Sequence, residues 1–243
     1  MGKDWFESWF DTSYYHILYG DRNDEEAQFF MDNLIDYLQP NSGSKILDMP
    51  CGKGRHSKYL ASFGFDVLGV DLSENSIKEA SEFTSENLYF QVHDMRKPIP
   101  GSQFHYIFNL FTSFGYFDSR EDNINVLHSA YMNLVRGGII VIDFMNSFKV
   151  AGNLNPKEEI EKQGIRFNIE RSLRKGKIVK SIEFKANDQW LNFEEQVQAF
   201  TLKDFKSMFK ETGFELIDHF GDYELNYYHA NTSDRLILIA RAV

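Results

Sequence analysis

Apolar residues recur at helical spacing in several stretches of the chain. In residues 24–38, Ala27, Phe30 and Leu34 fall on one helical face, and Pro40 follows as a stop signal. The same pattern predicts further helices over residues 54–64, 74–83, 120–135 and 202–213. Side chains that favour the N-cap position come just before three of them: Ser73, Ser119 and Thr201.

Short apolar runs lie between these helices and predict strands. The runs span residues 45–49, 65–73, 88–94, 104–111, 139–146, 214–220 and 235–243. Strands that alternate with helices of this length are typical of a parallel sheet covered by helices on both faces. In such sheets ligands bind beyond the carboxyl ends of the strands, near the point where strand order reverses.

The hydrophobic period changes to two after residue 155. Ile165, Phe167 and Ile169 alternate with polar residues, and similar alternation continues to about residue 200. We therefore expect an antiparallel β insert over residues 156–200, with its strands in about 164–200, inside a single domain of residues 1–243. Residues 1–40 are expected to form an N-terminal helical cap. The insert would act as a substrate lid or as the surface of a homodimer.

Composition narrows the class of protein. The chain has 42% hydrophobic and 26% charged residues, which suits an ordinary globular domain, and its formal net charge is −10. Nucleic acid is an unfavourable partner, since phosphate binding relies on clustered Lys and Arg. One cysteine, no signal peptide and no membrane-length apolar run predict a cytoplasmic protein without an internal disulfide. The seven histidines show no zinc-like spacing, so we expect no metal.

The segment "KILDMPCGKGRHSKYL" breaks a strand with two glycines and then restarts as a helix. Gly52 and Gly54 let the backbone approach a ligand, and the helix N-terminus offers free N–H groups. Asp71 ends the next strand, where its carboxylate suits a ribose diol. Asp48, Asp94 and Asn109 also come late in strands or just after them, so all four side chains should meet at one rim. Nicotinamide and adenosyl cofactors both fit these features.

Five segments in order resemble the class I S-adenosylmethionine-dependent methyltransferases. They are "ILDMPCGKGRHS", "VLGVDLS", "VHDMR", "FNLFTSFGYF" and "LVRGGIIVIDF". The resemblance covers residues 25–148 well, and the helix and strands of 201–243 are similar to the family's closing unit. It implies a single methyltransferase domain of the α/β class. Its doubly wound, mostly parallel, seven-stranded Rossmann-like sheet would have an antiparallel last strand.

The resemblance also implies roles for residues at the matching positions. S-adenosyl-L-methionine would be held by Asp48, Pro50, Cys51, Gly52, Gly54, Asp71, Leu72, Ser73, Asp94, Met95, Asn109 and Phe111. Asp48 and the glycine loop would hold the methionine part, Asp71 the ribose, Asp94 with Met95 the adenine, and Asn109 with Phe111 the region of the sulfonium. Pro50 departs from the family's usual glycine and removes one N–H donor. Cys51 is interpreted as a small residue beside the cofactor rather than a nucleophile.

Methyl transfer depends mainly on positioning, so the sequence says little about the acceptor. The candidates for acceptor-side or catalytic groups are Tyr14, Tyr15, His16, Tyr116 and His229, with Tyr227 as a further lining residue. Each of these residues also has an ordinary interpretation as a packing or surface residue. We expect a small-molecule acceptor. The alternatives are an NAD(P)-dependent oxidoreductase and a non-catalytic cofactor-binding protein.

Overall fold

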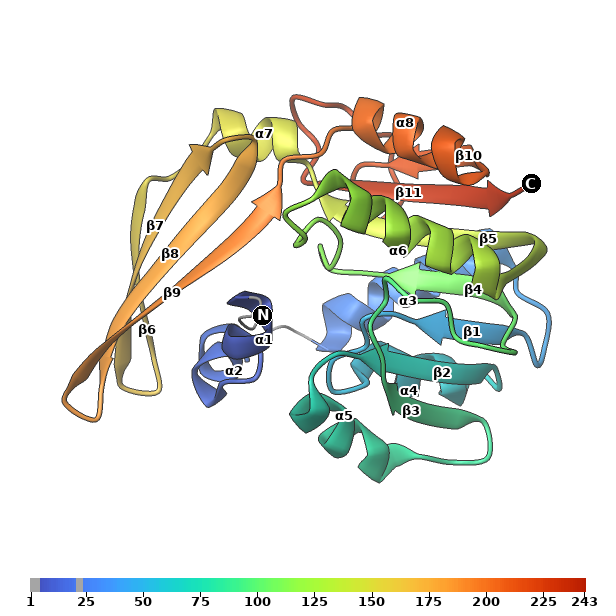
Figure 1. Ribbon diagram of the computed structural model, residues 1–243, viewed down its shortest axis with the longest axis horizontal. Coiled ribbons are helices and arrows are strands. Elements are labelled where there is room, and N and C mark those ends of the chain that lie inside the picture. The colour runs from blue at the N-terminus through green and yellow to red at the C-terminus, as the bar shows by residue number, and fades with distance from the viewer. Residues whose placement is uncertain (1–4, 21–23) are drawn as a thin grey trace.

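The computed structural model describes residues 5–20 and 24–243, and its main element is a seven-stranded sheet (Figure 1). The strand order is β10-β11-β5-β4-β1-β2-β3. Their bounds are β1 Lys45–Asp48, β2 Asp66–Asp71, β3 Leu88–Val92, β4 Phe104–Asn109, β5 Leu134–Met145, β10 Phe214–Phe220 and β11 Arg235–Ala242. All neighbours pair in parallel except β11, which is antiparallel to both β5 and β10. The predicted fold class is confirmed.

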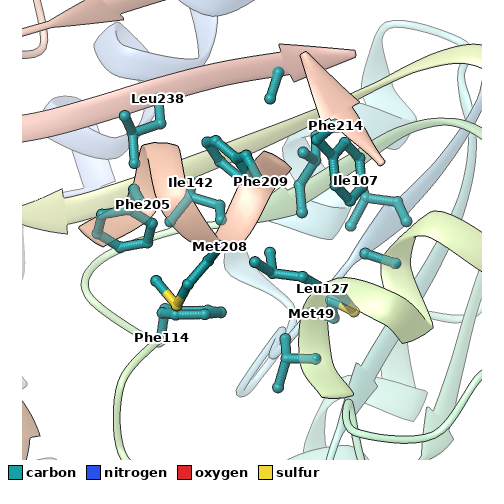
Figure 2. Packing of buried hydrophobic residues seen from close by; sticks show 14 of the residues in the cluster. Met49, Ile107, Phe114, Leu127, Ile142, Phe205, Met208, Phe209, Phe214 and Leu238 are labelled. Carbon is teal, nitrogen blue, oxygen red and sulfur yellow. The ribbon is translucent and has the colours of Figure 1, made fainter. Parts of the chain in front are cut away.

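Helices cover both faces of this sheet, and each face buries its own hydrophobic cluster. The helices outside the N-terminal segment are α3 Asp24–Leu38, α4 Arg55–Ser62, α5 Glu74–Ala80, α6 Arg120–Asn133, α7 Ser147–Gly152 and α8 Leu202–Thr212, with a short 3₁₀ turn η1 at Ser81–Phe83. On one face α3 and α4 pack Phe30, Leu34 and Leu60 against the strands. On the other, α6 and α8 bury residues such as Leu127 and Phe205 (Figure 2).

The predicted N-caps are confirmed. The hydroxyl of Ser73 accepts a hydrogen bond from Ser76 N, and that of Ser119 accepts one from Asp122 N. Thr201 and Asp204 form a reciprocal capping box. Each cap satisfies an N–H group that the first helical turn would otherwise leave unpaired, which fixes where the helix begins.

One predicted boundary is wrong. The helix expected to reach residue 135 ends at Asn133, and β5 begins at Leu134 rather than at residue 139. Asn133 is buried, and its side-chain amide bonds to both the N–H and the C=O of Ile99. This long-range contact fixes the end of the helix. The register shift between β4 and β5 then accommodates Gly137 and Gly138, which lie inside β5 rather than between a helix and a strand.

The insert forms a separate four-stranded antiparallel sheet in the order β6-β7-β8-β9. Its strands are β6 Lys157–Lys162, β7 Ile165–Arg174, β8 Lys177–Ala186 and β9 Gln189–Gln198. Strand β6 lies before the expected start of the antiparallel run at about residue 164. Its residues are mostly Lys and Glu, so the hydrophobic pattern does not indicate a strand there.

Two short helices, α1 Trp5–Trp9 and α2 Ser13–Tyr19, lie between the insert and the main sheet (Figure 1). Trp9 and Leu18 share a buried cluster with Phe167, Ile182 and Phe184 of the insert. The first two helices therefore pack on the insert while they approach the carboxyl ends of the parallel strands. No helix in residues 5–20 or 24–243 is both long and apolar enough to cross a membrane.

Candidate active site

Strand order reverses beside β1, which pairs with β2 on one side and β4 on the other. The connections that follow β1 and β4 both leave the carboxyl end of the sheet at this point, and a crevice opens between them. A cavity of about 460 Å³ lies at this position. The loop after β1, the ends of β2 and β3, the loop after β4 and helices α1 and α2 all contribute to its walls.

The loop after β1 uses both glycines in the left-handed region, with φ +55° at Gly52 and +77° at Gly54. Gly52 borders the cavity, and a Cβ added there would meet nothing within 4 Å. A Cβ at Gly54 would come within 2.6 Å of the Phe90 ring. Gly54 is thus required for packing under the loop. Gly52 is the glycine whose backbone faces the cavity.

Asp71 ends β2 and borders the cavity. Its Oδ2 accepts from Gly52 N at 2.8 Å, and its Oδ1 accepts from Ser73 N at 2.9 Å. Burial raises the pKa of Asp71, and these backbone hydrogen bonds partly oppose that effect. Each carboxylate oxygen has one donor and can accept another, so a pair of vicinal hydroxyl groups fits this side chain.

Asp94 also borders the cavity, but its main partner was not predicted. Arg96 forms a bidentate pair with it, with Nε 3.0 Å from Oδ1 and Nη2 2.9 Å from Oδ2. Burial alone would raise the pKa of Asp94, yet the hydrogen bonds and charge of Arg96 bring it below the usual value. Asp94 is therefore a carboxylate over a wide pH range, with part of its accepting capacity already used.

Asp48 and Asn109 lie beneath the loop, and neither is among the described residues that border the cavity. The Ser57 hydroxyl donates to Asp48 Oδ2 at 2.6 Å, and Asn109 Nδ2 donates to Met49 O at 2.8 Å. No hydrogen-bond partner is found for Asp48 Oδ1 or Asn109 Oδ1 among the described residues. Burial raises the pKa of Asp48 to about 7, although Ser57 lowers it. Two unsatisfied buried acceptors thus underlie the proposed cofactor loop.

One part of the cavity wall is aromatic. Phe10, Tyr15 and Tyr116 border the cavity, with ring centroids of Phe10 and Tyr15 4.9 Å apart and those of Phe10 and Tyr116 5.2 Å apart. Tyr19 lies one helical turn after Tyr15, with their ring centroids 4.9 Å apart. Such clusters exclude water and present π-electron density to a bound group.

His16 borders the cavity on α2 between the aromatic wall and the glycine loop. Burial lowers its pKa, and the charge of Lys53 lowers it further. The imidazole is therefore largely neutral near pH 7 and can accept a proton from a bound molecule.

Most of the residues proposed from sequence meet at this cavity. Those that border it are Pro50, Cys51, Gly52, Asp71, Leu72, Ser73, Asp94, Met95, Phe111, Tyr15, His16 and Tyr116. Those that do not are Asp48, Gly54, Asn109, Tyr14, His229 and Tyr227. Tyr14 packs on Phe184 of the insert, with ring centroids 4.8 Å apart, and Tyr227 is 81% exposed. His229 lies in a turn where its N–H donates to Ser233.

Other residues on the cavity wall escaped the sequence analysis, notably Phe6, Phe10, Tyr19, Arg55 and His56. The run "WFESWF" was the available signal for the first two, because apolar aromatics at this density are rarely left to solvent. Helix α1 has five residues, too few for a clear helical period. In the ranges 5–20 and 24–243, no three His, Cys, Asp or Glu side chains come together as a group that could hold a metal ion.

The fold is that of a doubly wound α/β protein with a cavity at the strand-order reversal. The sequence profile of a methyltransferase-domain family matches residues 23–219, and the chain belongs to this family. The predicted resemblance to S-adenosylmethionine-dependent methyltransferases is confirmed. The matched proteins give no support to the nicotinamide-dependent alternative.

Three similar proteins illustrate the relationship. YqeM of Bacillus subtilis, whose own assignment as a methyltransferase is provisional, is 36% identical over 121 residues, or 48% of each chain. The dTDP-3-amino-3,4,6-trideoxy-α-D-glucopyranose N,N-dimethyltransferase of Streptomyces venezuelae is 28% identical over 131 residues, 53% of this chain and 54% of that one. The chain thus spans about half the length of these relatives. The structure of an S-adenosylmethionine-dependent methyltransferase of Clostridium acetobutylicum has a TM-score of 0.79 and 18% identity, with 94% of this chain and 95% of the other covered.

Proposed function

We propose that this chain transfers a methyl group from S-adenosylmethionine to a small-molecule acceptor, with both bound in the 460 Å³ cavity. The observation that carries the proposal is the mixed lining of this cavity. Gly52 and Asp71 supply backbone and carboxylate groups to it, and Tyr15 and Tyr116 supply aromatic rings. A cavity with hydrogen-bonding groups for a nucleoside and an apolar part for a second molecule suits group transfer between two bound molecules.

The residues present fit this cofactor. Asp71 would hold the ribose diol, with Leu72 and Ser73 beside it, while the loop of Pro50, Cys51 and Gly52 would hold the methionine part. Asp94 and Met95 would meet the adenine, with Arg96 keeping the Asp94 carboxylate ionised and in place. Asp48, Gly54 and Asn109 would act from beneath by fixing the loop and the end of β4.

The cofactor supplies an activated methyl group on a sulfonium. The chain needs to orient the acceptor atom in line with that methyl and to exclude water. Phe10, Tyr15 and Tyr116 would do both, since their rings pack closely on the acceptor side. Phe111 would close the side between this wall and the glycine loop.

We further propose that the acceptor atom is an amine nitrogen. The Streptomyces venezuelae relative is named for dimethylation of an amino sugar nucleotide. An aromatic wall supports the same chemistry, because methylation moves positive charge from sulfur to nitrogen and π faces stabilise cations. His16 would take the proton that the amine loses, since its lowered pKa keeps it neutral.

The insert would support the acceptor wall from behind rather than contact the acceptor. Among the described residues, none from strands β6–β9 borders the cavity, whereas α2 contacts both the insert and the cavity. A homodimer and a cytoplasmic location are kept as expectations from the sequence.

A methyl-transfer assay on paired acceptors tests the proposal. The purified protein is incubated with S-adenosylmethionine and a panel of amino sugars and small amines, each paired with its hydroxyl analogue, and product mass is recorded. We expect a mass gain of one or two methyl groups on an amine and none on its hydroxyl partner. His16→Gln should lower kcat by about 10²-fold or more, within the usual contribution of a general base.

His229→Gln is the matched control, because His229 lies outside the described cavity wall and should leave turnover unchanged. Turnover of the hydroxyl analogues alone would contradict an amine acceptor. Cofactor binding without transfer to any acceptor of the panel would favour the non-catalytic alternative.

A further inference from the structure

Two consecutive residues on the cavity side of β4 have unusual backbone conformations. Phe111 has φ +58° and Thr112 has φ +60°, although neither is glycine. The left-handed region is uncommon for side chains of this kind, and for a β-branched residue such as Thr it is an outlier. Such conformations persist where surrounding contacts hold them, and they concentrate at functional sites.

One buried residue receives both backbone N–H groups of this turn. Asp143 Oδ2 accepts from Phe111 N at 2.8 Å, and the Asp143 carbonyl oxygen accepts from Thr112 N at 2.9 Å. Asp143 lies on β5 and is fully buried. Neighbouring strands are thus tied at the point where the chain enters the cavity wall.

Arg235, the first residue of β11, completes the network. Its Nε donates to Asp143 Oδ1 at 2.7 Å, and its Nη2 donates to Thr112 Oγ1 at 3.0 Å. The Tyr223 hydroxyl donates to Asp143 Oδ2 at 3.3 Å. The backbone and the side chain of the turn are therefore both bonded to one ion pair.

The turn sets the position of an aromatic ring at the cofactor end of the cavity. The Phe111 ring stacks on His56, with centroids 4.9 Å apart and an interplanar angle of 20°. The Arg55 guanidinium carbon lies 5.2 Å from the same ring. Arg55 and His56 begin α4 directly after the glycine loop, and both border the cavity together with Phe111.

We propose that Asp143 and Arg235 are positioning residues, which hold Phe111 and Thr112 in the left-handed turn and so fix the Phe111 wall of the cavity. Neither side chain is among the described residues that border the cavity, so both would act through the turn. The consequence for binding rests on the proposed methyltransferase function, whereas the consequence for the turn does not. A buried ion pair often contributes little net stability. We therefore assign this pair the role of holding the backbone of the turn.

The test uses a readout that needs no ligand. A ring stacked on His56 shifts the imidazole proton resonances upfield, so NMR of the full chain reports the position of Phe111. Thr112→Val keeps the shape and the ion pair but removes the acceptor for Arg235. Asp143→Asn removes the charge that pairs with Arg235. Both variants should move the His56 resonances toward the values of a free imidazole.

Glycine should rescue the turn, because glycine adopts positive φ without needing to be held. We expect Asp143→Asn with Thr112→Gly to regain the His56 shift that Asp143→Asn loses. The dissociation constant for S-adenosylhomocysteine should rise about five-fold or more in Thr112→Val and in Asp143→Asn, and it should return toward the wild-type value in the Asp143→Asn, Thr112→Gly double variant. Thr212→Val is the matched control, since it removes a buried hydroxyl that donates to Met208 O far from the turn, and it should leave both readouts unchanged.

An unchanged His56 shift in folded Thr112→Val and Asp143→Asn would overturn the proposal. If Asp143→Asn does not fold, Thr112→Val with Tyr223→Phe decides the question in the same way. A shifted His56 in a protein that binds no S-adenosylhomocysteine would uphold the positioning role and refute the proposed function instead.

Discussion

Three aspartates near the carboxyl ends of β1, β2 and β5 differ in their hydrogen-bond partners; Asp48 and Asp143 are buried, and Asp71 is partly exposed. Asp48 has one hydroxyl donor, Asp71 has two backbone N–H donors, and Asp143 has an arginine. Burial raises the pKa of all three, to about 7 for Asp48. Asp71 faces the cavity and suits a ribose, whereas the other two act on the surrounding backbone.

Asp48 should make stability depend on pH in a defined window. Its pKa is raised from 3.8 to about 7, so between these values the folded chain holds a proton that the unfolded chain has released. This contribution is complete below pH 3.8 and is lost as pH rises through 7. Relative to wild type, Asp48→Asn should therefore gain up to about 4 kcal/mol of unfolding free energy across the window. Urea unfolding at several pH values measures the difference.

Ser57→Ala is the second variant for urea unfolding at several pH values. Ser57 donates to Asp48 and lowers its pKa, so its removal should move the loss of stability to higher pH. Parallel stability profiles for wild type and Asp48→Asn would mean that Asp48 does not retain its proton in the folded chain.

At the scale of elements, the N-terminal helices are held from two sides. Glu195 of β9 accepts from Trp9 Nε1 at 2.7 Å and from the Tyr19 hydroxyl at 2.8 Å, while Lys180 contacts that hydroxyl. On the other side, Asp11 accepts from Ser73 and Asn75 at the start of α5. The segment of α1 and α2 therefore connects the insert to the start of α5 beside the cavity. Through this connection an insert outside the described cavity wall could affect catalysis.

Glu195→Gln tests that connection. Glutamine offers one acceptor oxygen and removes the negative charge that lies 4.0 Å from Lys180 Nζ, so the contact of α1 and α2 with β9 should weaken by about 1–3 kcal/mol. We expect a several-fold increase in acceptor KM, with a smaller change in S-adenosylhomocysteine affinity. Trp190→Ala at the exposed end of the insert is the control. A kinetic loss in Trp190→Ala together with a change of mass in light scattering would favour the dimer-surface interpretation instead.

The elements divide into those that local pattern predicts and those that it does not. Helix α3 and the capped helices α5 and α8 follow from periodicity and from Ser73 and Thr201, which act on their own first turns. The end of α6 depends on Asn133 and a turn 31–34 residues away, which a local pattern does not contain. The sequence indicates α2 at the cavity through Tyr15 and His16, but it does not indicate α1, because α1 packs on strands of the insert that lie far later in the chain.

For the whole molecule, topology predicts where the site lies. Parallel strands ending in Asp48, Asp71 and Asn109 must meet at one edge, and reversal of strand order beside β1 opens the crevice there. The partners of the site residues are less predictable, since Arg96 and Arg235 reach their carboxylates through side-chain geometry. Sequence therefore predicts which strand ends border the cavity better than it predicts the partners of these side chains.

Calorimetric titration with S-adenosylhomocysteine, with NADH as the paired ligand, is the decisive test of the proposed cofactor site. We expect a dissociation constant on the order of micromolar for the first ligand and no binding of the second. Asp71→Ala should weaken S-adenosylhomocysteine about 10- to 100-fold, because it removes charged hydrogen bonds, while Asp66→Ala at the opposite end of β2 should not. Binding of NADH alone would contradict S-adenosylmethionine as the cofactor, and unchanged affinity in Asp71→Ala would contradict the role proposed for Asp71.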